Sequence, residues 1–253
     1  MKRLSAGLLL AGWLFSGVLL AETLVVYSGA GLRPAVQPLL DAFEQQTGTQ
    51  VRVEYAGMGQ LMARYETTGR GDVFISGTHF YTDRLQAAGK MTEAHDLGYH
   101  TAVIGVHPSR AADIRHFDDL ARPGVRLALG DPQSMALGRT AEAILDASKL
   151  GDAIRANVVV RGTTVQQLAL YAAQGEVDAA LIGRTAALQQ GEKLRMVDIP
   201  LSIYEPERIT LGALVSSQQP ALAQQLIDFI RSPIGRQQFE KVGYILPEHR
   251  ITP

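Results

Sequence analysis

The chain has 253 residues, 46% of them hydrophobic, and a formal net charge of −1. This composition supports a folded protein with a sizeable core, and the small charge argues against nucleic acid or an anionic membrane surface as the partner. The sequence contains no cysteine, which excludes disulfides and thiolate metal sites.

The N-terminus has the pattern of a secretion signal. Lys2 and Arg3 precede an apolar run at 6–20, and the small residue Ala21 follows this run. We therefore predict a signal peptide at 1–21, cleavage near Ala21, and a periplasmic protein without a lipid anchor. An uncleaved membrane anchor is the alternative, but the run is shorter than the roughly 20 apolar residues that span a bilayer. Removal of Lys2 and Arg3 brings the formal charge of the mature chain to −3.

Short apolar strands alternate with helices through the rest of the chain. The first half predicts strands at 24–27, 51–55 and 73–76 and helices at 34–47, 59–68 and 80–88. A strand at 102–106 opens a second series, with strands at 125–129, 158–160 and 179–182 and helices at 137–148 and 165–174. Strands at 196–199 and 210–215 then lead to helices at 220–231 and 233–242. This alternation predicts an α/β fold of two units, each with a parallel sheet covered by helices.

The loop after the first predicted strand is suited to an anion. Ser28, Gly29, Ala30 and Gly31 separate this strand from a helix that begins near Pro34. A helix start carries unpaired N–H donors and a partial positive charge, and glycine lets a ligand approach the main chain closely. Ligands of open α/β sheets lie beyond the carboxyl ends of the strands, so two facing units would form a cleft lined by such groups.

Four short stretches of sequence together indicate a family. They are GDVFISG at 71–77, LALGDP at 127–132 followed by Gly138, GEVDAA at 175–180, and SPIG at 232–235 followed by Gly243-Tyr244. In this order and spacing the chain resembles the periplasmic molybdate-binding proteins of ABC importers. The resemblance implies two lobes, each a mostly parallel sheet flanked by helices, joined by two crossing segments and closing on a tetrahedral oxyanion. We accordingly expect lobe 1 at 22–101 and 200–253, lobe 2 at 102–199, and a membrane permease with its ATPase as partners.

The resemblance also implies where the ligand binds. The implied positions are Ser28, Gly29, Ala30, Gly31, Gly57, Met58, Gly59, Leu137, Thr164, Val165, Gly183 and Arg184. Three hydroxyls of the family are missing here, because its two serines align with Gly31 and Met58 and its tyrosine aligns with Gly183. Backbone N–H donors remain whatever the side chain is. The hydroxyls available nearby belong to Ser28, Ser76, Thr78, Thr163, Thr164 and Thr185. The resemblance implies no cofactor and no metal held directly by protein ligands, since an oxyanion is bound through its oxygens.

Arginines near the same loops leave the identity of the ligand open. Arg33, Arg139 and Arg184 lie at or beside loops that the resemblance places at the ligand, and a guanidinium favours a carboxylate or a phosphate. A solvated or ion-paired arginine is the simpler interpretation of each. Molybdate or tungstate is therefore the first expectation, and sulfate or a larger phosphorylated or polycarboxylate anion is the alternative.

Two other classes of protein fit the sequence less well. A hydrolase of the same fold class would need cooperating side chains, but the six histidines form no His-Glu-x-x-His pattern and the chain has no Gly-x-Ser-x-Gly elbow. The effector domain of a transcription regulator would need a DNA-binding helix-turn-helix where the export signal stands. We therefore expect a monomeric binding protein with no enzymatic activity, no nucleic-acid partner and no membrane insertion after signal removal.

Overall fold

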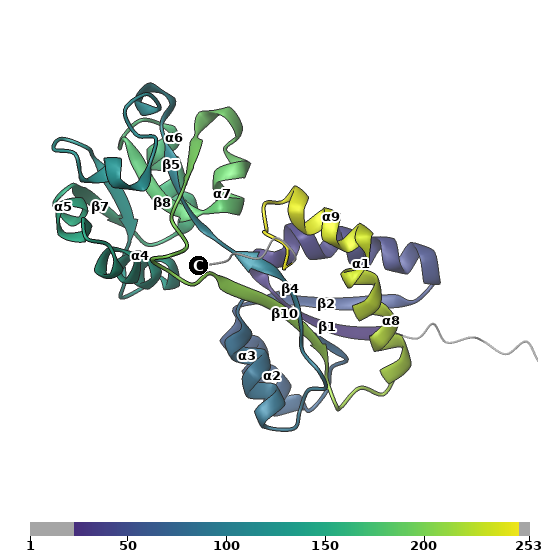
Figure 1. Cartoon of the computed structure of the whole chain (residues 1–253). Coiled ribbons are helices and arrows are strands. Elements are labelled where there is room, and N and C mark those ends of the chain that lie inside the picture. The colour runs from purple at the N-terminus through teal and green to yellow at the C-terminus, as the bar shows by residue number, and fades with distance from the viewer. Residues whose placement is uncertain (1–22, 248–253) are drawn as a thin grey trace, which may run out of the picture.

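The computed structural model describes residues 23–247, which form two lobes lying side by side (Figure 1). The predicted signal peptide at 1–21 and the end of the chain at 248–253 lie outside the described residues. Each lobe contains one five-stranded sheet with helices on both faces. Between residues 23 and 247 the structure has no helix long and apolar enough to cross a membrane.

The first lobe is built on a sheet with the strand order β2-β1-β3-β10-β4. Its strands are β1 (Thr23–Gly29), β2 (Gln50–Ala56), β3 (Val73–Ser76), β4 (His95–His100) and β10 (Glu207–Ala213). One face is covered by α1 (Arg33–Thr47), α8 (Pro220–Arg231) and α9 (Pro233–Lys241). The other face is covered by α2 (Met58–Thr68) and α3 (His79–Ala87).

The second lobe repeats this plan with the strand order β7-β6-β8-β5-β9. Its strands are β5 (Ala102–Val106), β6 (Leu127–Gly130), β7 (Val158–Gly162), β8 (Ala179–Gly183) and β9 (Arg195–Asp198). Helices α4 (Ala136–Ala147) and α5 (Gly151–Ala156) cover one face, and α6 (Val165–Ala173) and α7 (Arg184–Gln189) cover the other. Short 3₁₀ turns lie at Ala30–Leu32, Pro108–Arg110, Phe117–Ala121 and Gly191–Lys193.

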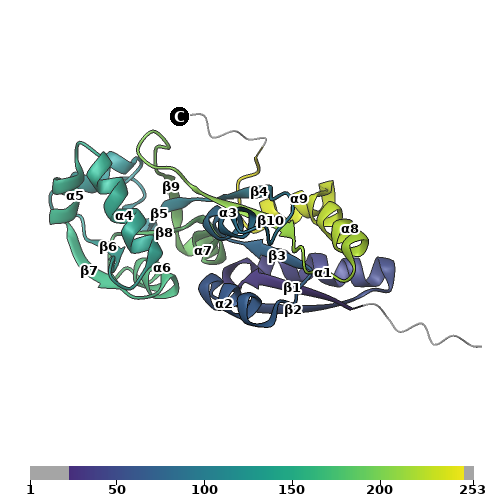
Figure 2. The same ribbon diagram turned by 90° about the horizontal axis from the view of Figure 1, so that it is seen from below.

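One strand in each sheet runs against the other four. β10 is antiparallel to β3 and β4, and β5 is antiparallel to β8 and β9. These are the strands that the chain enters from the other lobe, because β4 continues through Thr101 into β5 and β9 continues through 199–206 into β10. A strand that enters from the other lobe starts where its neighbours end, so it runs in the opposite direction. Figures 1 and 2 show both connections passing between the lobes.

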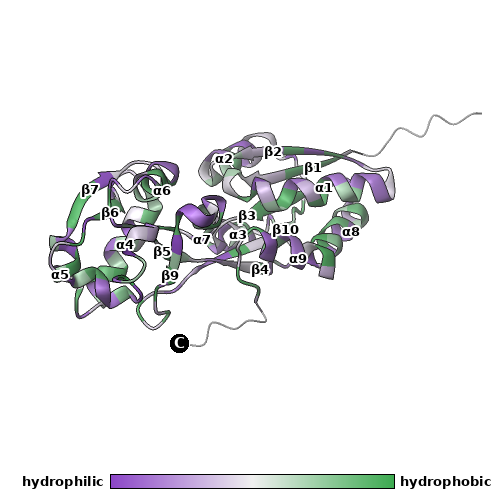
Figure 3. Cartoon of the chain, turned by 90° about the horizontal axis from the view of Figure 1, so that it is seen from above, coloured by the Kyte–Doolittle hydropathy of each residue, from purple (hydrophilic) through white to green (hydrophobic). Residues whose placement is uncertain are grey.

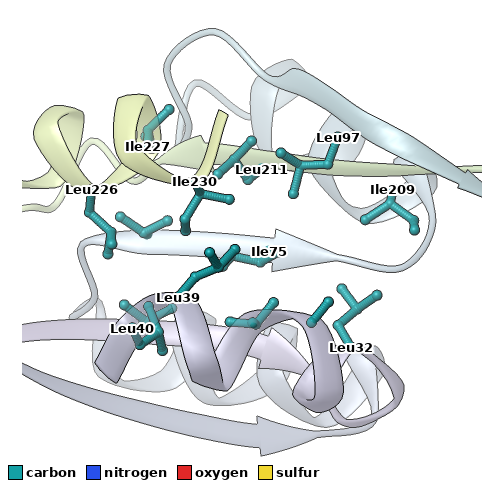
Figure 4. Close-up of a cluster of buried hydrophobic side chains, with 14 of the residues drawn as sticks. Leu32, Leu39, Leu40, Ile75, Leu97, Ile209, Leu211, Leu226, Ile227 and Ile230 are labelled. Carbon is teal, nitrogen blue, oxygen red and sulfur yellow. The ribbon is translucent and has the colours of Figure 1, made fainter. Parts of the chain in front are cut away.

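Helix α1 illustrates how the sequence determines the packing. Leu39, Leu40 and Phe43 recur at helical spacing, and each is at most 2% exposed. Leu39 and Leu40 lie near Ile75 of β3, and Ile230 of α8 belongs to the same cluster on this face of the sheet (Figure 4). Hydrophobic and hydrophilic residues follow one another along both α1 and α8 (Figure 3). The apolar stripe of each helix therefore fixes which face meets the sheet.

A buried aspartate supports each sheet at the same place. Asp72 lies directly before β3, where its carboxylate accepts the Val25 N–H at 2.7 Å and the Ser217 hydroxyl at 2.6 Å. Asp178 lies directly before β8 and accepts the Arg126 N–H at 2.9 Å. In both lobes the carboxylate satisfies an N–H of the neighbouring chain segment just before the parallel ladder begins. These aspartates belong to the stretches 71–77 and 175–180 that carried the family resemblance.

Removal of the first of these carboxylates should destabilise the protein. We expect Asp72→Ala to lower the free energy of unfolding by about 2 kcal/mol, because the partly buried Val25 N–H loses its partner. Asp83→Ala, at an exposed position of α3, is the matched control and should change it by less than about 0.5 kcal/mol. Urea unfolding followed by circular dichroism measures both variants. Equal effects would show that the Asp72 hydrogen bonds contribute nothing.

The predicted two-lobed α/β fold is confirmed, with mixed sheets in which four of five strands share a direction. The predicted helices and strands are present, with ends shifted by at most three residues. The prediction lacks β4, α5 and α7. The predicted lobe limits at 101/102 and 199/200 remain a prediction, because Thr101 and 199–206 belong to neither sheet.

Candidate functional site

A cleft of about 430 Å³ lies between the two lobes. The first lobe contributes the loops after β1, β2 and β3 and the end of β4, and the second lobe contributes the starts of α6 and α7. The cleft therefore lies where the carboxyl ends of the parallel strands face one another. Open α/β sheets bind their ligands at this edge.

Four helix starts border the cleft, namely the turn Ala30–Leu32 before α1 and the first turns of α2, α6 and α7. The first N–H groups of a helix have no partner within the helix and carry a partial positive charge. Some are already engaged. The Gly57 N–H donates to the Gln60 side chain at 3.3 Å, and the Arg184 N–H donates to the Thr101 carbonyl at 2.9 Å. The backbone N–H groups that follow Gly57 in α2, and those of the first turn of α6, remain available to donate hydrogen bonds to an anion.

The cleft lining carries no permanent charge. Among the described residues that form it there is no Asp, Glu, Lys or Arg, and the titratable side chains are His100 and Tyr244. Burial raises the pKa of Tyr244 to about 12, and its hydroxyl donates to the Gly31 carbonyl at 3.2 Å. Burial lowers the pKa of His100, and nearby Glu207 acts in the opposite direction. An anion in this cleft would meet no repelling carboxylate.

The structure brings most of the sequence-predicted site residues together. Those that line the cleft are Gly29, Ala30, Gly31, Gly57, Met58, Val165 and Gly183. Leu137 lines an adjoining cavity of about 320 Å³, which shares His100 and Val165 with the cleft. Ser28, Gly59, Thr164 and Arg184 lie outside both linings.

The candidate hydroxyls differ in their availability to a ligand. Ser28 is fully buried, and its Oγ has no hydrogen-bond partner among residues 23–247. Thr164 is engaged in capping α6, since its Oγ1 accepts the Gln167 N–H at 3.1 Å. Ser76 Oγ donates to the Thr78 carbonyl at 2.6 Å. Of the six hydroxyls named from the sequence, Thr185 is the one that lines the cleft in the described part of the chain.

Two of the three candidate arginines have partners outside the cleft. The Arg33 guanidinium stacks on the Tyr55 ring, 4.4 Å from its centroid. Arg139 is exposed and donates to the Pro132 carbonyl at 3.4 Å. The simpler interpretation of an arginine engaged at the surface therefore describes both.

Arg184 connects the second lobe to the crossing segment. Its guanidinium donates to Thr101 Oγ1 at 3.1 Å and forms an ion pair with Asp198 at the end of β9. Both partners lie where the chain passes between the lobes. In this structure Arg184 therefore acts on the connection, while its neighbour Gly183 lines the cleft.

The sequence prediction omits both titratable side chains of the cleft, His100 and Tyr244, and also the amides of Gln166 and Gln189. Tyr244 follows α9, and its ring centroid lies 5.5 Å from that of Phe239 and 5.8 Å from that of His100. Gly243-Tyr244 is a landmark of the resemblance, which is the sequence signal that could have identified Tyr244. His100 has no comparable signal. Between residues 23 and 247 no group of three His, Asp or Glu side chains is placed to hold a metal ion.

Two α/β lobes, two crossing segments and an interlobe cleft bordered by helix starts define a two-lobed solute-binding protein. The chain belongs to the family of bacterial extracellular solute-binding proteins, whose model matches residues 24–245. The family relationship covers almost all described residues.

Individual relatives agree with this assignment. A Haemophilus influenzae relative, whose name gives binding in general and no ligand, is 37% identical over 89% of this chain and 91% of its own. The molybdate-binding protein ModA of Mycobacterium tuberculosis is 26% identical over 90% of this chain and 86% of its own. A substrate-binding domain from Clostridium difficile has the same fold, with a TM-score of 0.81 at 19% identity over 88% of this chain and 98% of its own. The resemblance to molybdate-binding proteins is thus confirmed as a relationship.

Proposed function

We propose that this chain is the solute-binding component of an ABC importer and captures a tetrahedral oxyanion, molybdate or tungstate, in its interlobe cleft. The observation that carries the proposal is a cleft that, within residues 23–247, is bordered by four helix starts and lined by no carboxylate. Helix starts bind anions through N–H groups and the helix dipole. The relationship to the molybdate-binding protein of Mycobacterium tuberculosis supports the same class of ligand.

The donors of the cleft favour a fully deprotonated oxyanion. A proton on the ligand would face an N–H donor with no acceptor to receive it, which costs free energy. Molybdate, tungstate and sulfate are fully deprotonated at neutral pH, whereas phosphate keeps a proton. We therefore propose discrimination against hydrogen phosphate.

Capture should proceed by closure of the two lobes without covalent chemistry. A ligand held by donors of both lobes stabilises the closed arrangement, and Thr101 and 199–206 are the segments that can bend. We propose that the mature protein is a periplasmic monomer without enzymatic activity. It would then deliver its ligand to a membrane permease driven by an ATPase.

A larger organic anion is the second candidate, and the adjoining cavity favours it. That cavity is lined partly by apolar side chains, including Met135 and Leu137, and it opens beside the cleft at His100 and Val165. A compact oxyanion would not extend into both spaces. A phosphorylated or polycarboxylate compound could place its anionic group in the cleft and its organic part in the second cavity.

Titration calorimetry distinguishes the two candidates. The mature protein, unfolded and refolded to remove any bound ligand, is titrated with molybdate, tungstate, sulfate, phosphate, glycerol 3-phosphate and citrate. Tight binding of molybdate or tungstate without a response to phosphate supports the first candidate. Binding of an organic anion alone would replace it with the second.

Arg184 provides a further distinction between these ligands. Since its guanidinium is paired with Asp198, we expect Arg184→Ala to change the Kd of molybdate by less than about threefold. An organic phosphate that recruits Arg184 on closure would lose about 1.5 to 3 kcal/mol of binding free energy. Arg139→Ala, at an exposed position of α4, is the control. A large loss of molybdate affinity in Arg184→Ala alone would show that Arg184 acts on the ligand or on closure.

A further inference from the structure

We propose that His100 contacts the bound anion and takes up a proton from solvent when the anion binds, so that capture is coupled to protonation. This inference deepens the proposed function and rests on it. No sequence pattern predicts His100 as a site residue, but in the structure it lines both the cleft and the adjoining cavity.

His100 lies at the junction of the two cavities. It is the last residue of β4, directly before the crossing at Thr101. His100 and Val165 are the two residues that line both the 430 Å³ cleft and the 320 Å³ cavity. The helix starts of α2 and α6 border the cleft, whereas the start of α4 borders the second cavity. A ligand in either space therefore has the imidazole ring in its lining.

The imidazole also lies against Gly183, the last residue of β8, which has no side chain. A Cβ built on Gly183 would lie 3.3 Å from both Cε1 and Nε2 of His100. Gly183 itself lines the cleft. His100 therefore presents a hydrogen-bonding group of the first lobe directly against the end of β8 in the second lobe.

The ring of His100 is held in place while its nitrogens remain available. Tyr244 lies against it, with ring centroids 5.8 Å apart, and the Tyr244 hydroxyl is fixed by the Gly31 carbonyl. Among residues 23–247 neither ring nitrogen of His100 has a hydrogen-bond partner, and neither is sealed from solvent. Together with the position of His100 in both cavity linings, this leaves a ligand in the cleft as their natural partner.

The charges around His100 favour one added proton once an anion is present. Glu207 of β10 is opposite His100 in the sheet register, and it also lies 3.9 Å from His79 of α3. Glu207 favours the protonated ring, but burial outweighs it and lowers the pKa of His100. The other charged or titratable groups on the surrounding elements are Arg184 paired with Asp198, Arg208 paired with Asp96, Tyr204, Glu205 and Tyr244.

Anion binding and protonation should therefore reinforce each other. A dianion in contact with the ring favours the imidazolium form and raises the pKa of His100. The complex then holds more protons than the empty protein. In the pH range where the His100 ring is neutral without the anion and protonated with it, the affinity for the anion should fall by up to about tenfold for each unit rise in pH.

Calorimetry in two buffers with different heats of ionisation measures this coupling. Molybdate or sulfate is the probe, because both stay dianionic at about pH 7.5. We expect uptake of about one proton per bound anion. His100→Gln keeps a hydrogen-bonding side chain that does not titrate. It should take up no proton and bind molybdate at least about tenfold more weakly. His116→Gln, at an exposed position of the second lobe, should match the wild type.

The outcomes separate this inference from the proposed function. Anion binding by the wild type without proton uptake would overturn the role of His100 and leave the proposed function intact. Failure of folded wild-type protein to bind either anion would overturn both. If His100→Gln does not fold, NMR titration of the His100 ring in the wild type, with and without molybdate, decides the question. A ring pKa that does not rise on binding would overturn the inference.

Discussion

Replacement of Gly31 with leucine should abolish most anion binding while leaving the fold intact. A Cβ built on Gly31 has no neighbour within 4 Å, and its φ lies outside the region that strains other residues. The new side chain would therefore enter the cleft, which Gly31 lines. Loss of two charge-assisted hydrogen bonds, each of about 1.5 to 3 kcal/mol, predicts a weakening of about a hundredfold or more. Calorimetry with molybdate measures the affinity, and thermal unfolding measures the fold.

The control places the same side chain at another helix start of the first lobe. Ala221 is exposed near the start of α8, outside the cleft lining. Ala221→Leu should change neither the Tm nor the Kd. An unchanged molybdate affinity in Gly31→Leu would remove the loop after β1 from the binding site.

Replacement of Gly138 with alanine should damage both stability and binding. A Cβ built on Gly138 would lie 2.5 Å from the carbonyl carbon and oxygen of Asp131 and 2.8 Å from the carbonyl carbon of Gly130. These are backbone atoms that cannot rotate away, so α4 must move off the end of β6. We expect a loss of about 3 kcal/mol in the free energy of unfolding and a fall of roughly 10 °C in Tm.

The displaced helix start should also weaken anion binding, because Ala136 and Leu137 at this end of α4 line the second cavity. Gly77→Ala is the matched control for stability, since a Cβ built there has no neighbour within 4 Å. Differential scanning calorimetry measures both variants. A Gly138→Ala protein that melts within about 2 °C of the wild type would show that α4 and β6 tolerate a wider separation.

The elements predicted correctly from the sequence are those with a local pattern. Helix α1 has an apolar stripe, and β3 is a continuous apolar run, so each is marked by its own residues. Strand β4 has the sequence His-Asp-Leu-Gly-Tyr-His, which shows neither apolar alternation nor high strand propensity. Its conformation depends on pairing with β10 and on the bridge between Tyr99 and Ile245. Helices α5 and α7 have six residues each, too few for a recognisable period.

The same distinction applies to the candidate site. The backbone of the cleft is predictable, because glycines and helix starts are visible in the local sequence around Gly31 and Gly57. His100 and Tyr244 enter the cleft through contacts between segments far apart in the chain. No local pattern indicates His100, and the Gly243-Tyr244 landmark is the one signal for Tyr244. The pairing of Arg184 with Asp198 is likewise a tertiary contact. The main-chain loops of a binding site can thus be predicted from local sequence, whereas side chains that reach the site through tertiary contacts cannot.

The order of strands in the first sheet has a consequence for incomplete chains. All five strands of the second lobe come from one continuous segment, from Ala102 to Asp198, and the nearby residues Ile199, Ile203 and Tyr204 pack against the core of this lobe. In the first lobe, β10 lies between β3 and β4 and pairs with both. A chain that stops before Glu207 therefore has a complete second lobe, but its β4 has no strand to pair with. The first lobe can close its sheet only after the chain has left it, built the whole second lobe and returned.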